Sequence, residues 1–283
     1  MPPKPEWLRV RYAQAPDLEA VEALLDSLKL NTVCKEAGCP NCVECFSRKT
    51  ATFLIMGTNC TRNCRFCSVK SGDPQELDPG EPGRAAQAVR ELGLKYVVVT
   101  SVTRDDLPDG GASHFAQTIR EIQKASPGTV IEVLIPDFQG DCDALQTVAG
   151  ANPAVISHNM ETVRSLYPAV RPQAQYQRSL NVIKNIKLPG SYIRSKSGIM
   201  VGLGETKTQV FELFGDLLDV GCEFLTIGQY LAPSKQHMPV HEYIEPPLFE
   251  EYGSIAKEMG FKYVASAPFV RSSFHAGQAF GLD

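Results

Sequence analysis

Three cysteines with an unusual spacing are the residues best suited to carry out chemistry. Cys60, Cys64 and Cys67 form a C-x3-C-x2-C pattern. Three thiolates on one short loop can bind three irons of a cubane cluster, because thiolate is the soft ligand that iron–sulfur centres require. The fourth iron is then open, as a catalytic metal site needs. The alternative is a zinc loop that borrows a fourth ligand, although zinc ligands usually come as paired C-x2-C units.

A second group of cysteines lies upstream, at Cys34, Cys39, Cys42 and Cys45. Such a concentration of thiols indicates a disulfide knot, a zinc module or a cluster site. Disulfides are disfavoured, because the chain is not a small secreted domain and lacks the apolar segment of an export signal. Metal ligation is favoured, and spacing alone leaves open a zinc site that uses all four upstream thiols.

The bulk composition excludes several classes of protein. Hydrophobic residues make up 43% of the 283 residues and charged residues 21%, as in an ordinary globular protein. The formal net charge is −4, so we expect no nucleic-acid partner. No apolar run reaches about eighteen residues, so we expect no membrane span. The expected location is the cytoplasm, and the oligomeric state stays open.

The elements that must position the cysteines form a repeat of strand and helix. Alternating units of this kind predict a parallel sheet with helices packed outside it. The strand segments are nearly continuous apolar runs, as expected when both faces are covered. The predicted strands are Thr52–Met56, Tyr96–Thr100, Val130–Ile135, Ala154–Ser157, Gly198–Leu203 and Phe224–Gln229. The predicted helices between them are Arg84–Leu92, His114–Lys124, Asp143–Ala149, Glu161–Leu166, Tyr176–Ile186 and Thr208–Val220.

The expected fold is therefore α/β, a partial (β/α)6 barrel of the TIM type with an extension at each end. We place the N-terminal cysteine-rich extension at residues 1–50, the barrel at 51–230 and the C-terminal extension at 231–283. The pattern leaves open a doubly wound sheet. In both folds the chemistry gathers at the C-terminal ends of the strands, where the Cys60–Cys67 loop lies. The extensions should add helices at Leu18–Leu30 and Pro247–Met259 and a strand at Lys262–Ala265.

The Cys60–Cys67 loop resembles the hallmark of the radical S-adenosylmethionine superfamily. In that superfamily the triplet follows the first barrel strand, and an aromatic residue, here Phe66, precedes the last cysteine. The resemblance implies that the amino and carboxylate groups of S-adenosyl-L-methionine chelate the open iron. It also implies that an electron from the cluster cleaves this cofactor to a 5′-deoxyadenosyl radical.

Residues at later strand ends are implied contacts of the same cofactor. The second strand would bind the methionine amino group, the fourth the ribose, and the fifth the adenine. The residues concerned are Thr100, Ser101, Asn159, Glu161, Gly202 and Glu205. Two alternatives stay open, because a helix cap explains Asn159 equally well and tight strand-end packing explains the glycines of Gly198–Glu205.

The upstream cysteines, read as C-x4-C-x5-C, resemble the auxiliary-cluster motif of the lipoyl synthase family. This interpretation makes Cys34, Cys39 and Cys45 the ligands of a second 4Fe-4S cluster. Cys42 is an extra thiol that departs from the family pattern, and we take it as a bystander rather than as a replacement ligand.

The similarity extends over almost the whole chain and ends at Arg271–Ala276, which resembles the family's R-S-S-Y motif. In the family, a serine of this motif binds the fourth iron of the auxiliary cluster. The corresponding residue is Ser273, with Ser272 as the alternative. Phe274 stands where the family usually has tyrosine, which removes a hydroxyl but not the implied ligand.

The resemblance implies an enzyme that inserts sulfur at C6 and C8 of an octanoyl group, with the auxiliary cluster as sulfur donor. A saturated acyl chain has no acidic proton and no leaving group, so its functionalisation needs a radical cofactor. The implied partners are octanoylated lipoyl-carrier proteins, namely the E2 lipoyl domains of 2-oxoacid dehydrogenases and the glycine cleavage H protein. A reduced ferredoxin- or flavodoxin-type electron donor is also implied. The competing hypotheses are a biotin-synthase-like enzyme and a non-catalytic zinc-binding module.

Overall fold

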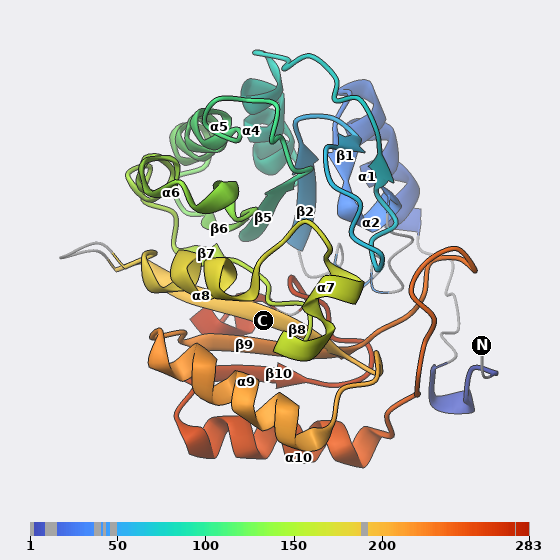
Figure 1. The fold of residues 1–283 in the computed structure, drawn as a ribbon. Helices are drawn as coiled ribbons and strands as arrows, with labels where there is room; N and C mark the ends of the chain where they lie inside the picture. The colour runs from blue at the N-terminus through green and yellow to red at the C-terminus, as the bar shows by residue number, and fades with distance from the viewer. Residues whose placement is uncertain are drawn as a thin grey trace.

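The sheet runs through the structure in the same order as the chain. The computed structural model describes residues 3–8, 16–36, 41, 44–45, 50–187, 192–274 and 276–282. Eight strands form one sheet in the order β1-β2-β5-β6-β7-β8-β9-β10, and all neighbours are parallel except the antiparallel pair β1 and β2. A doubly wound sheet reverses its strand order, whereas this order keeps the crossover helices on one face. The predicted partial barrel is therefore confirmed (Figure 1).

The element bounds agree closely with the predicted repeat. The strands of the sheet are β1 (Asn31–Thr32), β2 (Thr50–Ile55), β5 (Tyr96–Ser101), β6 (Val130–Leu134), β7 (Val155–Ser157), β8 (Arg194–Val201), β9 (Phe224–Gln229) and β10 (Tyr263–Ser266). Two short strands, β3 (Asn59–Cys60) and β4 (Lys70–Ser71), form a separate pair. The α-helices are α1 (Pro16–Ser27), α2 (Val33–Glu36), α4 (Glu81–Glu91), α5 (Ala112–Ala125), α6 (Cys142–Ala149), α7 (Tyr167–Val170), α8 (Tyr176–Lys184), α9 (Lys207–Asp219) and α10 (Pro246–Met259). The 3-10 helices are η1 (Glu6–Leu8), η2 (Phe138–Gly140), η3 (Arg164–Leu166) and η4 (Ala276–Phe280).

The helix predicted at Glu161–Leu166 is wrong. Glu161 has a left-handed φ of 66°, which does not fit an α-helix, and it forms an isolated parallel bridge with Ile199 of β8. Only Arg164–Leu166 forms a turn of 3-10 helix, and α7 follows it. Strand β8 also begins at Arg194, earlier than predicted, because Arg194 and Ser195 already pair with β7.

Local signals explain where several helices begin. Thr206 and Gln209 form a capping box at the start of α9, which satisfies backbone N–H groups that a helix N-terminus leaves free. At the start of α6, the Asp141 carboxylate accepts hydrogen bonds from the backbone N–H groups of Asp143 and Ala144.

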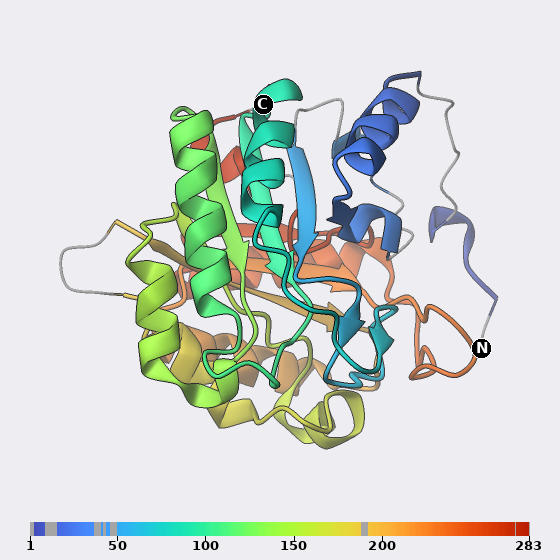
Figure 2. The same ribbon diagram turned by 90° about the horizontal axis from the view of Figure 1, so that it is seen from above.

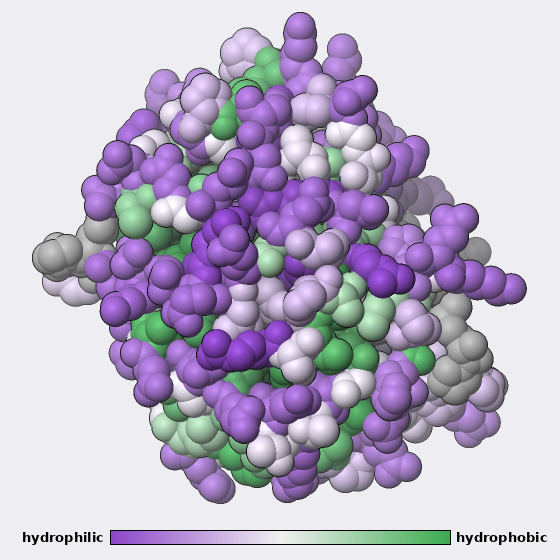
Figure 3. All heavy atoms as spheres, viewed as in Figure 1, coloured by the Kyte–Doolittle hydropathy of each residue, from purple (hydrophilic) through white to green (hydrophobic). Residues whose placement is uncertain are grey.

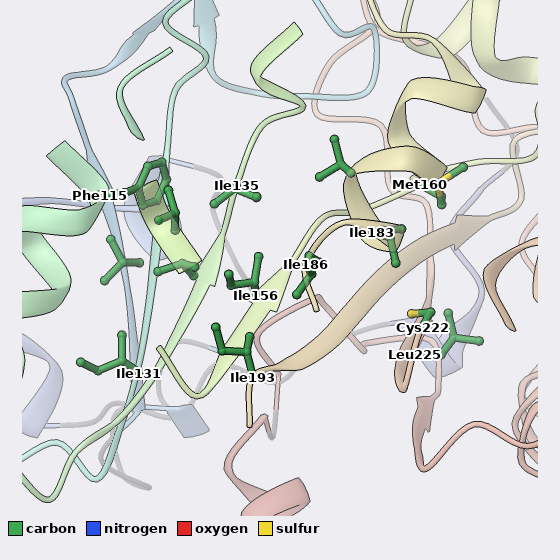
Figure 4. Close-up of a cluster of buried hydrophobic side chains, with 14 of the residues drawn as sticks. Phe115, Ile131, Ile135, Ile156, Met160, Ile183, Ile186, Ile193, Cys222 and Leu225 are labelled. Carbon is green, nitrogen blue, oxygen red and sulfur yellow. The ribbon is translucent and has the colours of Figure 1, made fainter. Parts of the chain in front are cut away.

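The main core lies between the sheet and the surrounding helices. Side chains alternate along a strand, so every second residue faces the helices. Figure 4 shows part of this core, with Ile131, Ile156 and Leu225 from the strands and Phe115 and Ile183 from the helices. All five are at most 2% exposed, which makes the sheet and helices one packed unit.

The inner face of the sheet holds a buried polar network. Glu132 of β6 accepts two hydrogen bonds from Lys196 Nζ of β8, each of 2.9 Å, and one of 2.6 Å from the hydroxyl of Tyr96 of β5. Tyr96 begins β5, Lys196 is the third residue of β8 and Glu132 lies in the middle of β6, so a satisfied ion pair is buried among these three strands.

The outer surface agrees with the expected globular character. The face shown in Figure 3 is mostly hydrophilic, with smaller hydrophobic areas between polar side chains. Among the helices of the described ranges, none is both long enough and apolar enough to cross a membrane.

Candidate functional site

The cysteine loop leaves the sheet through a strained turn directly after β2. Met56 and Gly57 have left-handed φ values of 66° and 91°. The buried Glu81 carboxylate accepts a 2.9 Å hydrogen bond from the Met56 N–H and also contacts Nε2 of His114 at 2.8 Å. Helices α4 and α5 therefore fix the point at which the loop begins.

Hydrogen bonds tie the first half of the loop to the segment after β5. The backbone N–H and the hydroxyl of Thr61 both donate to the Thr103 carbonyl, at 3.1 and 3.0 Å. The sulfur of Cys60 accepts from the backbone N–H groups of Thr103 and Arg62, at 3.3 and 3.4 Å. Two N–H donors aimed at one sulfur stabilise negative charge, so this position fits a metal-bound thiolate.

A buried ion network fixes the middle of the loop. Arg62 donates to both carboxylate oxygens of Asp105, at 2.6 and 2.8 Å, and to Asp137 at 2.6 Å. Burial acts to raise the pKa of Asp137, but hydrogen bonds and charge from Arg62 lower it to about 2. The guanidinium thus joins the loop to the segments that follow β5 and β6.

The second half of the loop is held by segments from the other side of the barrel. The Arg65 N–H donates to the Val170 carbonyl at 2.9 Å, and the Met238 N–H donates to the Arg65 carbonyl at 2.8 Å. His237 Nε2 lies 3.0 Å from the carbonyl oxygen of Cys67. Phe66 packs in the apolar cluster that contains Val170, Leu203, Tyr230 and Val240.

Two thiols of the triplet, those of Cys64 and Cys67, lie in surroundings that favour the protonated form. All three are half-buried and lie outside any disulfide. Burial raises the pKa of Cys67 to about 12 and also raises that of Cys64. Such thiols stay protonated near neutral pH unless a cation binds them, which fits cluster ligands rather than reactive cysteines.

The donor set fits a cubane better than a single ion. Within the described ranges, no three His, Cys, Asp or Glu side chains converge as ligands of one metal ion. A cubane binds each thiolate through a different iron, so its three cysteines need not meet at one point.

A buried polar group lies beside the triplet and was missed by the sequence analysis. Arg171 is 9% exposed, and its Nη1 donates to the Asn159 carbonyl at 2.8 Å and to the Tyr167 hydroxyl at 3.0 Å. Its charge acts on both Cys64 and Glu161 and opposes the rise in their pKa that burial causes. The only sequence signal was an arginine before a proline, after the fourth strand.

The polar atoms around Arg171 are incompletely satisfied. Asn159 Nδ2 donates to Glu161 at 3.0 Å, whereas in the part of the chain that the structure describes Asn159 Oδ1 and Arg171 Nε have no hydrogen-bond partner. Buried polar atoms without partners indicate a ligand or water that completes them. Asn159 and Glu161, predicted from the sequence, are thus brought together next to a cation that suits a carboxylate.

The other predicted cofactor contacts have different surroundings. Thr100 donates its hydroxyl to the Leu134 carbonyl at 2.9 Å, whereas Ser101 Oγ is buried and has no partner within the described residues. Glu205 accepts from the N–H groups of Gly202 and Leu203, at 2.6 and 3.0 Å, and so holds the turn after β8. These contacts give Thr100 and Glu205 structural roles, and their contact with the cofactor stays a prediction.

A Cβ at Gly202 would approach the Glu242 carbonyl to 2.3 Å. Glycine is therefore required there for close packing, in agreement with the alternative given for this segment.

The described residues predicted for the second cluster lie on separate segments. Cys34 is half-buried on α2 and lines a small pocket with Leu30 and Lys35. Cys45 is also half-buried. Cys39 and the extra Cys42 lie outside the described residues. Ser273 lies half-buried in the turn closed by the hydrogen bond from the Phe274 N–H to the Arg271 carbonyl, at 3.0 Å.

Among the described residues, a side-chain contact from Asn41 reaches the C-terminal segment. Asn41, which stands between Cys39 and Cys42, is 8% exposed, and its Nδ2 donates to the Phe269 carbonyl at 2.8 Å. Asn41 therefore lies against the segment that leads to Ser273, although the two are far apart in the sequence. A donor set of thiols with one hydroxyl fits a cluster whose fourth iron is held weakly.

Comparisons with known proteins agree with the fold and the cysteine loop. The sequence pattern of the Radical SAM superfamily matches residues 54–217. The crystal structure of methylornithine synthase (PylB) is similar with a TM-score of 0.57 and 15% sequence identity, over 89% of this chain and 72% of that one. HydG, a maturase of the [FeFe]-hydrogenase, is similar with a TM-score of 0.52 and 14% identity, over 94% and 71%. Fold and site together define a radical S-adenosylmethionine protein.

Closer relatives define the family within this class. The lipoyl synthase of Caldanaerobacter subterraneus subsp. tengcongensis is 58% identical over 279 residues, which are 99% of this chain and 98% of that protein. The lipoyl synthase of Geobacter metallireducens is 52% identical over 278 residues, 98% of each chain. The chain belongs to the lipoyl synthase family, which decides against the biotin-synthase-like enzyme and the zinc-binding module.

Proposed function

We propose that this chain has the catalytic activity of a lipoyl synthase. It inserts two sulfur atoms, at C6 and C8 of an octanoyl group held on a lysine of a lipoyl-carrier protein. The observation that carries the proposal is the Asn41–Phe269 contact of 2.8 Å, which joins the upstream cysteine segment to the loop of Ser273. The same chain therefore offers a second cluster site besides the open triplet of Cys60, Cys64 and Cys67.

The cofactors are S-adenosyl-L-methionine and two 4Fe-4S clusters. When bound, they supply a carbon radical able to remove hydrogen from a saturated chain, and the sulfur that replaces the hydrogen. Cys60, Cys64 and Cys67 hold the first cluster. Cys34, Cys39, Cys45 and Ser273 hold the second.

The chain's own residues bind and orient the small cofactor. The Arg171 guanidinium, next to Cys64, pairs with the methionine carboxylate and so places the methionine group against the open iron. Asn159 binds a polar group of the nucleoside through Oδ1, which has no protein partner among the described residues, and the neighbouring Glu161 carboxylate binds another. Phe66 and the apolar cluster around it keep water away from this side of the loop.

The proposed function requires an acyl-carrier substrate and a source of electrons. Lipoyl-carrier proteins are the substrates, and we infer that these are E2 lipoyl domains and the glycine cleavage H protein. A reduced ferredoxin- or flavodoxin-type protein supplies electrons, and the reaction takes place in the cytoplasm, where thiol ligands stay reduced. The division at residues 50 and 230 stays a prediction, with β1 and β10 of the two extensions joined to the barrel sheet.

The experiment is an anaerobic assay of the reconstituted protein on an octanoyl-lysine peptide. Iron, sulfide and zinc are counted in the same preparation. We expect lipoyl-lysine product and about eight irons per chain, since two cubanes carry four each. One equivalent of zinc without iron, or eight irons without any thiolated product, would contradict the proposal.

A further inference from the structure

The segment that carries Ser273 runs along the inner face of the sheet from one end of the strands to the other. Its upper part pairs with the C-terminal end of β9, where the N–H groups of Ala267 and Gln229 donate to the carbonyls of Ile227 and Pro268, each at 3.2 Å. Gly228 makes this possible, because a Cβ there would lie 2.1 Å from the Val270 carbonyl oxygen. Residues 267–270 therefore lie in close backbone contact with β9, just before Ser273 in the chain.

Residues 276–282 of the segment pack at the N-terminal ends of the strands. The Phe280 ring lies 6.0 Å from that of Tyr96 and 6.2 Å from that of Phe224, which begin β5 and β9. Ala276 and Gly277 are buried, and Leu282 packs against the small apolar cluster of Tyr96 and Val98. Figure 2 shows the C-terminus at the opposite end of the strands from the β3–β4 pair, which lies next to the cysteine loop.

Tyr96 provides a fixed surface for this packing. Its hydroxyl donates to Glu132, and that carboxylate is in turn held by Lys196 at 2.9 Å. The ring that meets Phe280 therefore belongs to a buried and fully connected network.

We infer that the described residues of 267–274 and 276–282 form an inner strap that positions Ser273 for iron. The inference rests on the proposed function, in which Ser273 binds the auxiliary cluster. A serine oxygen is a hard and weak ligand for cluster iron compared with thiolate. Its binding depends on being held in place beforehand, because a weak ligand on a loose segment cannot offset the entropy of ordering that segment. Phe280 is a positioning residue, since it acts through the strap and not on the cluster.

The test uses Phe280→Ala in the full chain. Phe280 is 36% exposed, so its loss should loosen the strap without removing a buried core residue. In metal-free protein we expect amide hydrogen exchange in residues 276–282 to rise by about tenfold or more. After reconstitution we expect normal cleavage of S-adenosylmethionine, a loss of sulfur insertion of about tenfold, and the Mössbauer spectrum of Ser273→Ala at the auxiliary cluster.

Two further variants control for general destabilisation. Met259→Ala removes a side chain of similar exposure, 39%, at the end of α10, and should leave exchange and sulfur insertion unchanged. Phe280→Tyr keeps the ring and should restore both. Gly228→Val tests the upper end of the strap, because its side chain would displace Val270.

The outcomes separate this inference from the proposed function. If Phe280→Ala loosens the strap but the auxiliary spectrum and sulfur insertion stay as in the parent protein, the strap does not position Ser273. If neither Phe280→Ala nor Gly228→Val raises exchange, the strap is not a unit. If the parent protein itself makes no lipoyl product, the proposed function fails, whereas the exchange result still describes the strap.

Discussion

The two cluster sites differ in how their ligands are held. The triplet stands on one continuous loop, which hydrogen bonds fix to Thr103, Val170 and Met238 and which the buried Arg62 joins to two carboxylates. The described residues proposed for the auxiliary site, Cys34, Cys45 and Ser273, stand on separate short segments, and the ion pair of Lys35, next to Cys34, with Asp26 is largely exposed. We infer that the triplet site, which is used in every turnover, is fixed by hydrogen bonds to the barrel. The auxiliary site, which gives up sulfur, is formed by segments outside the barrel.

The largest effect should come from the triplet. Cys64→Ala removes one of three thiolates from the fixed loop, and residues 60–67 contain no fourth cysteine to replace it. We expect cleavage of S-adenosylmethionine to be abolished and iron to fall from about eight to about four per chain. Cys142→Ala, at an exposed cysteine, is the control and should change neither quantity. Residual cleavage by Cys64→Ala at the parent rate would refute the ligand assignment.

The next largest effect should come from Ser273, whose substitution should separate cofactor cleavage from sulfur insertion. Ser273→Ala leaves the triplet intact, so cleavage of S-adenosylmethionine should continue while the lipoyl product is lost. Ser272→Ala is the matched control one residue away, and it should form product. Both activities are read by chromatography of 5′-deoxyadenosine and of the peptide. Product at normal yield from Ser273→Ala, with none from Ser272→Ala, would move the ligand to Ser272.

Cofactor binding should depend strongly on the buried arginine. Arg171→Lys keeps the charge but loses the fork that contacts Asn159 and Tyr167. We expect the KM for S-adenosylmethionine to rise about tenfold or more, with the iron content unchanged. Tyr167→Phe removes only the acceptor hydroxyl and should have a smaller effect. An unchanged KM in Arg171→Lys would show that the guanidinium does not bind this cofactor.

A substitution beside the triplet should lower the free energy of unfolding more than a substitution beside Cys34 does. Arg62→Gln leaves the carboxylate of Asp137, which is 1% exposed, without its main partner, and should lower the free energy of unfolding by about 3 kcal/mol. Lys35→Ala breaks a pair whose side chains are 58% and 64% exposed, and should cost less than about 1 kcal/mol. Denaturant unfolding of the metal-free protein measures both. Equal losses would remove the contrast between the sites.

The last effect, which is absent at neutral pH, should be a pH dependence of stability from His158. Its Nδ1 donates to the Ile135 carbonyl and its Nε2 accepts from the Ser179 hydroxyl, both at 2.9 Å, so the neutral ring is satisfied. Burial and the charges of Arg171 and Arg62 lower its pKa to about 4, against the Ile135 carbonyl and Asp137, which raise it.

The sign follows from the unfolded state, which binds a proton near pH 6.5 while the folded ring does not. His158 should therefore cost nothing above pH 7 and remove up to roughly 3 kcal/mol of stability as pH falls from 6.5 to 4. His158→Gln should flatten this part of the stability curve. An equally steep fall in the variant would assign the dependence to other groups.

The sequence was sufficient for features that depend on local pattern. The six strands, the loop of Cys60–Cys67 and the strand-end places of Asn159 and Glu161 follow from alternation and spacing. The left-handed Glu161 could not be predicted, because it is imposed by the bridge to Ile199, far along the chain. The same holds for Arg171, whose importance comes from burial beside Cys64 and not from any motif.

The auxiliary site shows the same limit. Spacing pointed to Cys34 and Cys45, but the contact between Asn41 and the Phe269 carbonyl joins residues that no periodic pattern connects. The course of the inner strap likewise depends on packing against Gly228 and Tyr96 from distant strands.

The central claim is that the fixed site persists and the assembled site is consumed. The most direct measurement is an iron and sulfide count on one sample before and after a single anaerobic turnover with octanoyl-lysine peptide. We predict a fall from about eight to about four irons per chain, with at most one lipoyl product per chain and with the remaining iron still able to cleave S-adenosylmethionine. Lipoyl product formed while all the iron and sulfide stay on the protein would contradict the account.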